Sequence, residues 1–191
     1  QDKNLSQKSA RTPADAKPPT FLGLAGIANV STTTLELTWA PASDDVSDPS
    51  DIVYDVYQAE SPGAQVFAVP SKTTAPGATS ETITGLSSGN PYFFVVRARD
   101  KAGNRETNTV EQTVNTRVSF KQDVQPILTN SCALDGCHTN NLPQSGLILS
   151  PGFAYANMVD VKSSNNKLLK RVFPGSISDS YLYRKITNTQ G

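Results

Sequence analysis

The stretch PYFFVVRARD, residues 91–100, is the clearest strand in the chain. Successive side chains of a strand point to opposite faces of the sheet, so residues two apart share a face. One face carries Tyr92, Phe94, Val96 and Ala98, and the other carries Phe93, Val95, Arg97 and Arg99. We expect the first face to enter a core and the two arginines to lie on a solvated surface.

The same alternation continues on both sides of this stretch. TTLELTWA, residues 33–40, places Leu35, Leu37 and Trp39 on one face. IVYDVYQAE, residues 52–60, is predicted to set Val53 and Val56 against tyrosines. Clusters of Gly, Pro, Ser, Asn and Asp separate these runs, and helix-length amphipathic segments are absent. The pattern predicts an all-β, immunoglobulin-like sandwich over residues 19–118.

A proline-rich entry, Trp39 and GLSSGNPYFFVVRARDKAGN (residues 85–104) resemble a fibronectin type III domain. The resemblance implies that Leu86 and Tyr92 pack beside Trp39 and fix the corner between two strands. In related sandwiches the tyrosine hydroxyl bonds to upstream backbone. Such domains serve as spacers, adhesion modules and linkers, so the fold alone does not specify a function.

The composition excludes some partners. The 17 basic residues balance 17 acidic ones, which argues against nucleic acid or an anionic membrane. No run of about 18 apolar residues occurs, so no membrane span is expected. Residues 1–18 lack an initiator Met and are polar, as in a processed exported protein. We expect a flexible tail, which could add a strand to a neighbouring sandwich and build a homo-oligomer or filament.

An acidic loop lies inside the predicted sandwich. ASDDVSDPSD, residues 42–51, gathers Asp44, Asp45, Asp48 and Asp51. Carboxylates so close together could hold a hard cation such as Ca²⁺, but they lack the oxygen spacing and Gly position of a dedicated calcium loop. A polar turn is therefore the expected role.

SCALDGCHTN, residues 131–140, holds both cysteines and the single histidine of the chain. Two cysteines in an exported chain suggest a disulfide, here Cys132 to Cys137. A histidine directly after the second cysteine is instead typical of covalent haem attachment, although the usual interval is two residues and here it is four. A structural zinc site would lack a fourth ligand. The motif alone leaves disulfide and haem open.

A short helix is predicted just before this motif. In SFKQDVQPILTN, residues 119–130, apolar side chains recur at helical spacing. Ser119 and Gln122 could form a capping box. Pro126 lacks an amide donor, so the helix either begins late, with Asp123 as its cap, or bends.

Residues 119–191 as a whole resemble a small, mainly α-helical c-type cytochrome domain. The resemblance rests on the order of SFKQDVQPILTNSCALDGCH, SGLILS, AYANMVDVKSS and VFPGSISDSYLYRKI. It implies one covalent haem c, with Cys132 and Cys137 as thioether anchors and His138 as the proximal iron ligand. It also implies a backbone acceptor for the His138 ring near Pro143, or at Leu142 beside it. The expected apolar walls are Leu142, Leu147, Leu149, Phe153, Leu168, Leu169, Val172, Tyr181, Leu182 and Ile186.

The distal side of the iron departs from that family, because the chain has no Met-Pro segment after its last predicted helix. Met158 is the single methionine, so it is the one candidate sulfur ligand, and a plain core role is the other interpretation. A lysine, the N-terminal amine, water or a group beyond Gly191 are further alternatives.

Two functional hypotheses follow. The first is an exported bacterial monohaem cytochrome, periplasmic, cell-surface or extracellular, that exchanges electrons with redox partner proteins or other cytochromes, with the sandwich as spacer, docking or assembly module. The second is a non-redox cell-surface adhesion or binding module with a Cys132–Cys137 disulfide. No catalytic constellation is visible, so no enzyme is predicted. The expected organisation is a tail (1–18), a sandwich (19–118) and a haem domain (119–191).

Overall fold

The computed structural model describes residues 14–141 and 143–189. The chain divides into two compact units between Arg117 and Val118. No helix within the described ranges is both long enough and apolar enough to cross a membrane. The proposed strand-adding arm falls largely on residues 1–13, outside the described ranges. Within residues 14–18, Lys17 pairs with Asp45 of the sandwich, with Lys17 Nζ 2.6 Å from Asp45 Oδ2.

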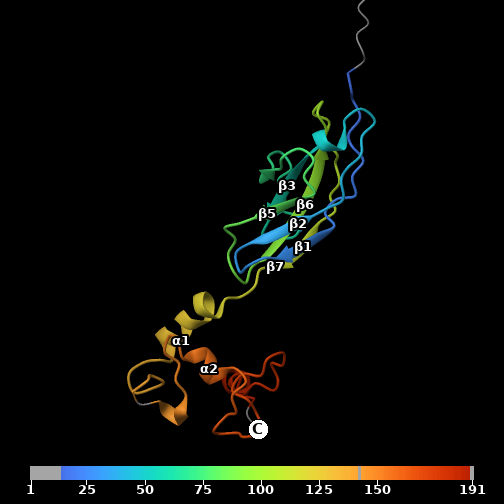
Figure 1. The fold of residues 1–191 in the computed structure, drawn as a ribbon. Coiled ribbons are helices and arrows are strands. Elements are labelled where there is room, and N and C mark those ends of the chain that lie inside the picture. Colours follow the sequence, from blue (N-terminus) through green and yellow to red (C-terminus); the bar gives the residue numbers. More distant parts are fainter. Residues whose placement is uncertain (1–13, 142, 190–191) are drawn as a thin grey trace, which may run out of the picture. The chain divides into compact units, whose positions relative to one another are not determined.

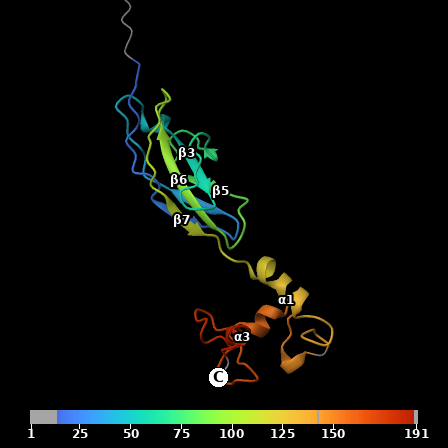
Figure 2. The ribbon, with the colours of Figure 1, turned by 180° about the vertical axis from the view of Figure 1, so that it is seen from behind.

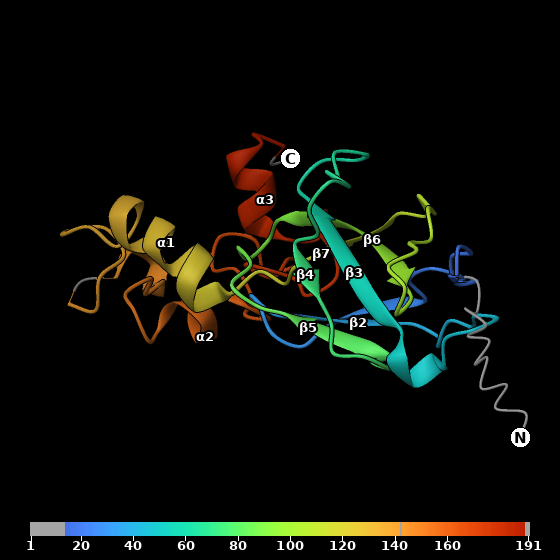
Figure 3. The same cartoon turned by 90° about the horizontal axis from the view of Figure 1, so that it is seen from above.

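Two antiparallel sheets form the first unit (Figures 1 and 3). One sheet has the order β1-β2-β5 and consists of β1 (Gly26–Asn29), β2 (Leu35–Thr38) and β5 (Ser80–Ile83). The other has the order β4-β3-β6-β7 and consists of β4 (Lys72–Thr73), β3 (Val53–Ala59), β6 (Pro91–Arg99) and β7 (Gln112–Asn115). The long strand β6 runs between β3 and β7 (Figure 2). The predicted sandwich is confirmed.

The core lies between the two sheets, and the alternation in β6 predicts its contribution correctly. The buried set includes Leu35, Leu37, Trp39, Leu86, Tyr92, Phe94, Val96 and Ala98. The prediction for β3 was wrong at Val53, which is half-buried, while Tyr54 and Val56 enter the core. Val53 and Val56 are three residues apart, and period-two alternation cannot place both on one face.

The expected tyrosine corner is present. The hydroxyl of Tyr92 accepts a hydrogen bond from the Ser87 amide at 2.9 Å, which ties the chain before β6 to the core. Leu86 and Tyr92 are both buried in the cluster that contains Trp39.

Replacing Tyr92 with Phe is expected to lower the free energy of unfolding of the first unit by about 1–2 kcal/mol, because the Ser87 amide loses its acceptor. Trp39 is the single tryptophan and is buried in the sandwich, so its fluorescence during urea unfolding reports on this unit. Tyr183→Phe, at an exposed ring in the second unit, is the matched control and should leave the midpoint unchanged. An unchanged midpoint in Tyr92→Phe would contradict the role of the hydroxyl.

The opposite face of β6 is only partly solvated, contrary to the sequence expectation for Arg97. Arg97 is 9% exposed, and its guanidinium lies 3.6 Å from the centroid of the Phe67 ring. Its Nε donates to the Asn108 carbonyl at 2.8 Å. Residues beyond the strands therefore cover this face, which strand alternation cannot reveal.

The second unit consists of short helices joined by turns. They are the π-helical turn η2 (Phe120–Val124), α1 (Gln125–Ser131), the 3-10 turn η3 (Gln144–Gly146), α2 (Ala154–Met158) and α3 (Tyr181–Ile186). A small core joins them and contains Leu128, Leu149, Ala154 and Met158.

The entry to α1 differs in detail from the prediction. The Ser119 hydroxyl accepts from the Gln122 amide at 3.2 Å, as a capping residue does. The reciprocal bond goes from the Ser119 amide to the Asp123 carboxylate and not to Gln122. Val124 is the N-cap of α1 instead of Asp123, because η2 continues directly into α1. Pro126 lies in the first turn of α1, where its missing amide costs nothing.

Candidate functional site

The cysteine motif begins where α1 ends. The Cys132 amide donates to the Leu128 carbonyl at 2.9 Å and completes the last turn of the helix. A turn follows, in which the Cys137 amide donates to the Leu134 carbonyl at 3.0 Å and Gly136 adopts a φ of 78°. That φ favours glycine, so Gly136 allows the tight turn between the two cysteines. Cys132 is half-buried, Cys137 is exposed, and both thiols are free.

Two contacts position His138, one at its backbone carbonyl and one at its ring. Its carbonyl accepts from the Leu149 amide at 2.8 Å, and its ring Nδ1 lies 3.1 Å from the Leu147 carbonyl oxygen. With the proton on Nδ1, this contact is a donated hydrogen bond that orients the ring and leaves Nε2 as a lone-pair donor. Most metal-binding histidines have such an arrangement.

The acceptor for the His138 ring was predicted wrongly at Pro143. The Pro143 carbonyl instead accepts from the Gly146 amide at 3.2 Å, within the turn that contains η3. This turn brings the following residue, Leu147, opposite the imidazole. The alternative, Leu142, falls outside the described residues.

A pocket opens beside His138. Its enclosed volume is about 90 Å³, within about 530 Å³ of space that is partly open to solvent. Its lining includes the apolar side chains of Leu147, Met158 and Leu182 together with Tyr181, while Arg171 and Lys185 supply positive charge. The enclosed part is smaller than the roughly 300–1,000 Å³ of small-molecule and cofactor sites, so a cofactor here would lie largely in the part open to solvent.

Met158 is the last residue of α2 and is 5% exposed. It belongs to the small core and also lines the pocket that His138 lines. Both of its predicted roles, core residue and distal ligand, therefore stay open.

Several predicted apolar walls do not enclose the pocket. Leu168 is 95% exposed, and Phe153 and Ile186 are also exposed. Leu168 lies in a turn and Ile186 ends the six-residue helix α3, so neither has an element packed over it. Leu147, Tyr181 and Leu182 do line the pocket, and Leu149 is buried in the adjacent core.

The donors fit covalent haem better than zinc. A structural zinc ion requires its ligand atoms to converge on one point at about 2.0–2.3 Å. Across the described ranges, the one convergent group of His, Cys, Asp or Glu is Asp15, Asp44 and Asp100, in the first unit. Thioether anchors instead bond to separate carbons of the macrocycle, so their sulfurs need not converge. Two free thiols, a ring nitrogen available for iron and a partly apolar pocket are the groups that haem c requires.

Two antiparallel sheets closed by a tyrosine corner place the first unit in the class of immunoglobulin-like sandwiches. The fibronectin type III domain family matches residues 17–114. The chain therefore belongs to this family through its first unit.

The curated relatives are long enzymes. Chitinase A1 of Niallia circulans is 31% identical over 113 residues, which are 59% of this chain and 14% of that protein. Exoglucanase B of Cellulomonas fimi is 37% identical over 114 residues, which are 60% of this chain and 9% of that protein. The chain thus spans a small fraction of the length of each relative.

Two solved structures are similar to part of the chain. The sixth fibronectin type III domain of human fibronectin type III domain containing protein 3 is 20% identical, covers 58% of this chain and 92% of that one, and has a TM-score of 0.39. The β-1,2-glucanase of Parabacteroides distasonis is 14% identical, covers 61% of this chain and 15% of that one, and has a TM-score of 0.45.

Proposed function

We propose that this chain is part of an exported bacterial protein in which the fibronectin type III unit is a non-catalytic spacer or docking module. We further propose that the second unit carries electrons on one covalently attached haem. Cys132 and Cys137 would anchor the macrocycle and His138 would ligate the iron. The observation that carries the haem proposal is the pocket that His138 and Met158 line together, with two free thiols next to His138 in the chain.

The spacer role has its own support. The relatives that share the sandwich are named for chitin and glucan hydrolysis, and those polymers lie outside the cell. In those proteins the matched part is a small fraction of the whole chain. A module that recurs beside unrelated units suits spacing or docking.

The residues around the pocket would each have a separate role in binding a haem. The Leu147 carbonyl fixes the orientation of the His138 ring and raises its basicity. Leu147 and Leu182 exclude water from one side, and Arg171 and Lys185 offer positive charge toward acidic groups of a bound molecule. Bound haem would supply one-electron redox chemistry, with a potential set by axial ligands, burial and nearby hydrogen bonds.

A second candidate is a non-redox adhesion or binding module. The comparisons favour it, because the family match covers residues 17–114 and ends before the cysteine motif. The disulfide of that hypothesis is not formed in the structure, where both thiols are free.

Expression of the chain in a host that attaches haem c in its periplasm separates the two candidates. We expect a red protein whose Soret band persists after denaturing electrophoresis and whose mass exceeds that of the bare chain by one haem. The Cys132→Ser/Cys137→Ser double variant should be colourless, yet its Trp39 fluorescence should report a folded sandwich. A colourless parent protein with the mass of the bare chain would overturn the haem proposal and leave the binding module.

A further inference from the structure

Three carboxylates that are far apart in the sequence converge at one end of the sandwich. Asp15 lies in the segment that enters the first unit, Asp44 in the loop after β2, and Asp100 directly after β6. One carboxylate oxygen from each lies within 4.8 Å of the other two.

Two of these carboxylates each carry an unsatisfied buried oxygen. Asp15 Oδ2 and Asp44 Oδ1 expose less than 1 Å² each, and neither meets a hydrogen-bond donor from the described residues. Their other oxygens are occupied: Asp15 Oδ1 accepts from the Lys17 amide at 3.1 Å, and Asp44 Oδ2 accepts from the Val46 amide at 2.8 Å. A buried carboxylate oxygen without a partner is costly, so something must compensate these two.

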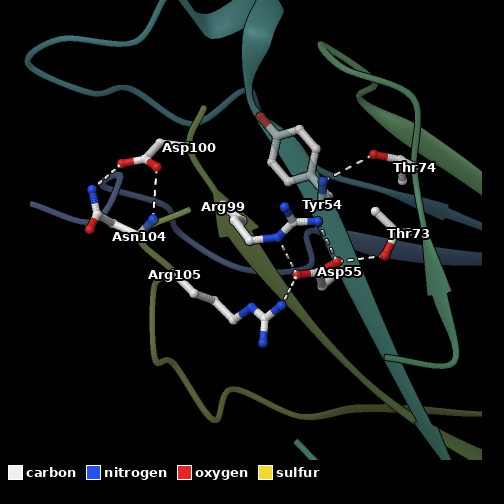
Figure 4. A network of polar contacts seen from close by, with 8 residues as sticks. All are labelled: Tyr54, Asp55, Thr73, Thr74, Arg99, Asp100, Asn104 and Arg105. Atoms are coloured by element: carbon white, nitrogen blue, oxygen red, sulfur yellow. Dashed lines mark hydrogen bonds and ion pairs between the residues drawn. The ribbon is translucent and has the colours of Figure 1, made fainter. Parts of the chain in front are cut away.

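The third carboxylate is the most deeply buried of the group. Asp100 is 2% exposed and accepts from the amide and the side-chain nitrogen of Asn104, at 2.8 and 2.7 Å (Figure 4). The same Asn104 side chain donates to the Asp15 carbonyl at 3.3 Å. Asn104, in the turn that follows β6, therefore links Asp100 to the backbone of Asp15.

The nearest cationic side chains bind elsewhere. Lys17 pairs with Asp45 at 2.6 Å, and Lys101 pairs with Asp51 at 3.2 Å. Among the ion pairs of the described ranges, none involves Asp15, Asp44 or Asp100. Three acidic groups therefore face one another without a directly paired cation, and Lys17 acts on Asp15 and Asp44 only at longer range.

We propose that Asp15, Asp44 and Asp100 bind a calcium ion. Calcium–oxygen bonds are about 2.3–2.6 Å long, so two oxygens on opposite sides of the ion lie about 4.8 Å apart. All three separations lie within that limit, and the flexible coordination of calcium by six to eight oxygens suits three carboxylates and water better than the near-ideal octahedron that magnesium demands. The ion satisfies both unpartnered oxygens at once, and waters fill its remaining positions.

The ligand set differs from the acidic loop that the sequence indicates. Only Asp44 of that loop takes part. Asp45 and Asp51 form the lysine pairs described above, and Asp48 caps η1 (Pro49–Asp51) by accepting from the Ser50 amide at 2.9 Å. The bound ion joins the entering segment to loops after β2 and β6, and it makes the order of residues 14–18 dependent on calcium. Extracellular modules bind calcium with dissociation constants of about 10⁻⁴–10⁻³ M.

Titration of the whole chain with CaCl₂ after EDTA treatment tests the site, with isothermal calorimetry for affinity and Trp39 fluorescence for the melting temperature of the sandwich. We expect one bound ion and a rise of roughly 4 °C or more in 10 mM calcium, since a ligand that binds only the folded state stabilises it. Calcium should also slow tryptic cleavage after Lys17.

Asp15→Asn and Asp44→Asn each remove one ligand charge and should weaken calcium binding at least tenfold. Asp45→Asn is the matched control, because it makes the same change in the same loop on a carboxylate that pairs with Lys17, and it should bind as the parent does. No binding heat and no melting shift in the parent at 10 mM calcium would overturn the proposal. Equal affinity in the parent and Asp44→Asn would do the same.

Discussion

Asp55→Ala is expected to lower the free energy of unfolding of the sandwich by about 3 kcal/mol, a large effect for a single substitution. The Asp55 side chain is fully buried on the face of β3 opposite the core. It pairs with Arg99 at 3.1 Å and with Arg105 at 2.9 Å, and it accepts from the Thr73 hydroxyl at 2.6 Å (Figure 4). Because both arginines are about one-third exposed, water offsets part of the loss, which places the estimate at the lower end for buried pairs.

The control for this prediction is Asp51→Asn, which breaks an exposed pair with Lys101 and should cost less than about 0.5 kcal/mol. Urea unfolding followed by Trp39 fluorescence measures both variants. If Asp55→Ala unfolds at the urea concentration of the control, then the Asp55 network does not stabilise the sandwich.

The same network predicts a pH dependence. Burial acts to raise the pKa of Asp55, but hydrogen bonds from Arg99 and Thr73 and the charges of Arg99 and Arg105 outweigh it, so the pKa lies below its ordinary value. A carboxylate with a lowered folded-state pKa stabilises the fold above its unfolded pKa of about 3.9 and loses that contribution as pH falls through the folded value. The stability gap between the parent and Asp55→Asn should therefore be full at pH 6 and shrink below about pH 4.

Met158→Leu is expected to have the second large effect, on the haem-bearing protein of the proposed function. If Met158 supplies the distal sulfur, the variant keeps its haem but loses the near-infrared sulfur-to-iron band of the oxidised state. Its reduction potential should fall by on the order of 0.1 V, a part of the roughly 0.8 V that axial ligands span. Leu conserves volume, so the fold should lose less than about 1.5 kcal/mol.

Leu128→Met is the matched control, because Leu128 packs in the same small core and does not line the pocket. That variant should keep both the band and the potential of the parent. Absence of the band in the oxidised parent would exclude Met158 as ligand and assign it to the core alone.

Within the sandwich, alternation predicts faces well where strands are long. Phe94 and Val96 of β6, and Leu35 and Leu37 of β2, lie in the core as expected. Alternation fails where a second layer covers the outer face. Arg97 is buried because Phe67, thirty positions earlier, lies under its guanidinium, and no local pattern predicts such a contact.

In the second unit, local motifs predict which residue types form the candidate site, but they do not predict which groups those residues contact. The adjacency of Cys137 and His138 is visible in the sequence, and so is the helix that leads into Cys132. The hydrogen-bond acceptor of the His138 ring is not visible in the sequence, because the position of that acceptor depends on how the turn around η3 folds back.

The amino-acid sequence by itself determined the strands of the sandwich, the tyrosine corner and the cysteine–histidine motif, because each depends on residues close together in the chain. Only the tertiary structure decided which side chains meet across long separations. It placed Leu147 against His138, buried Asp55 between Arg99 and Arg105, and brought Asp15 to Asp44 and Asp100. Those contacts follow from loop closure and packing, whose outcome is set by the whole fold and not by the spacing of residues along the chain.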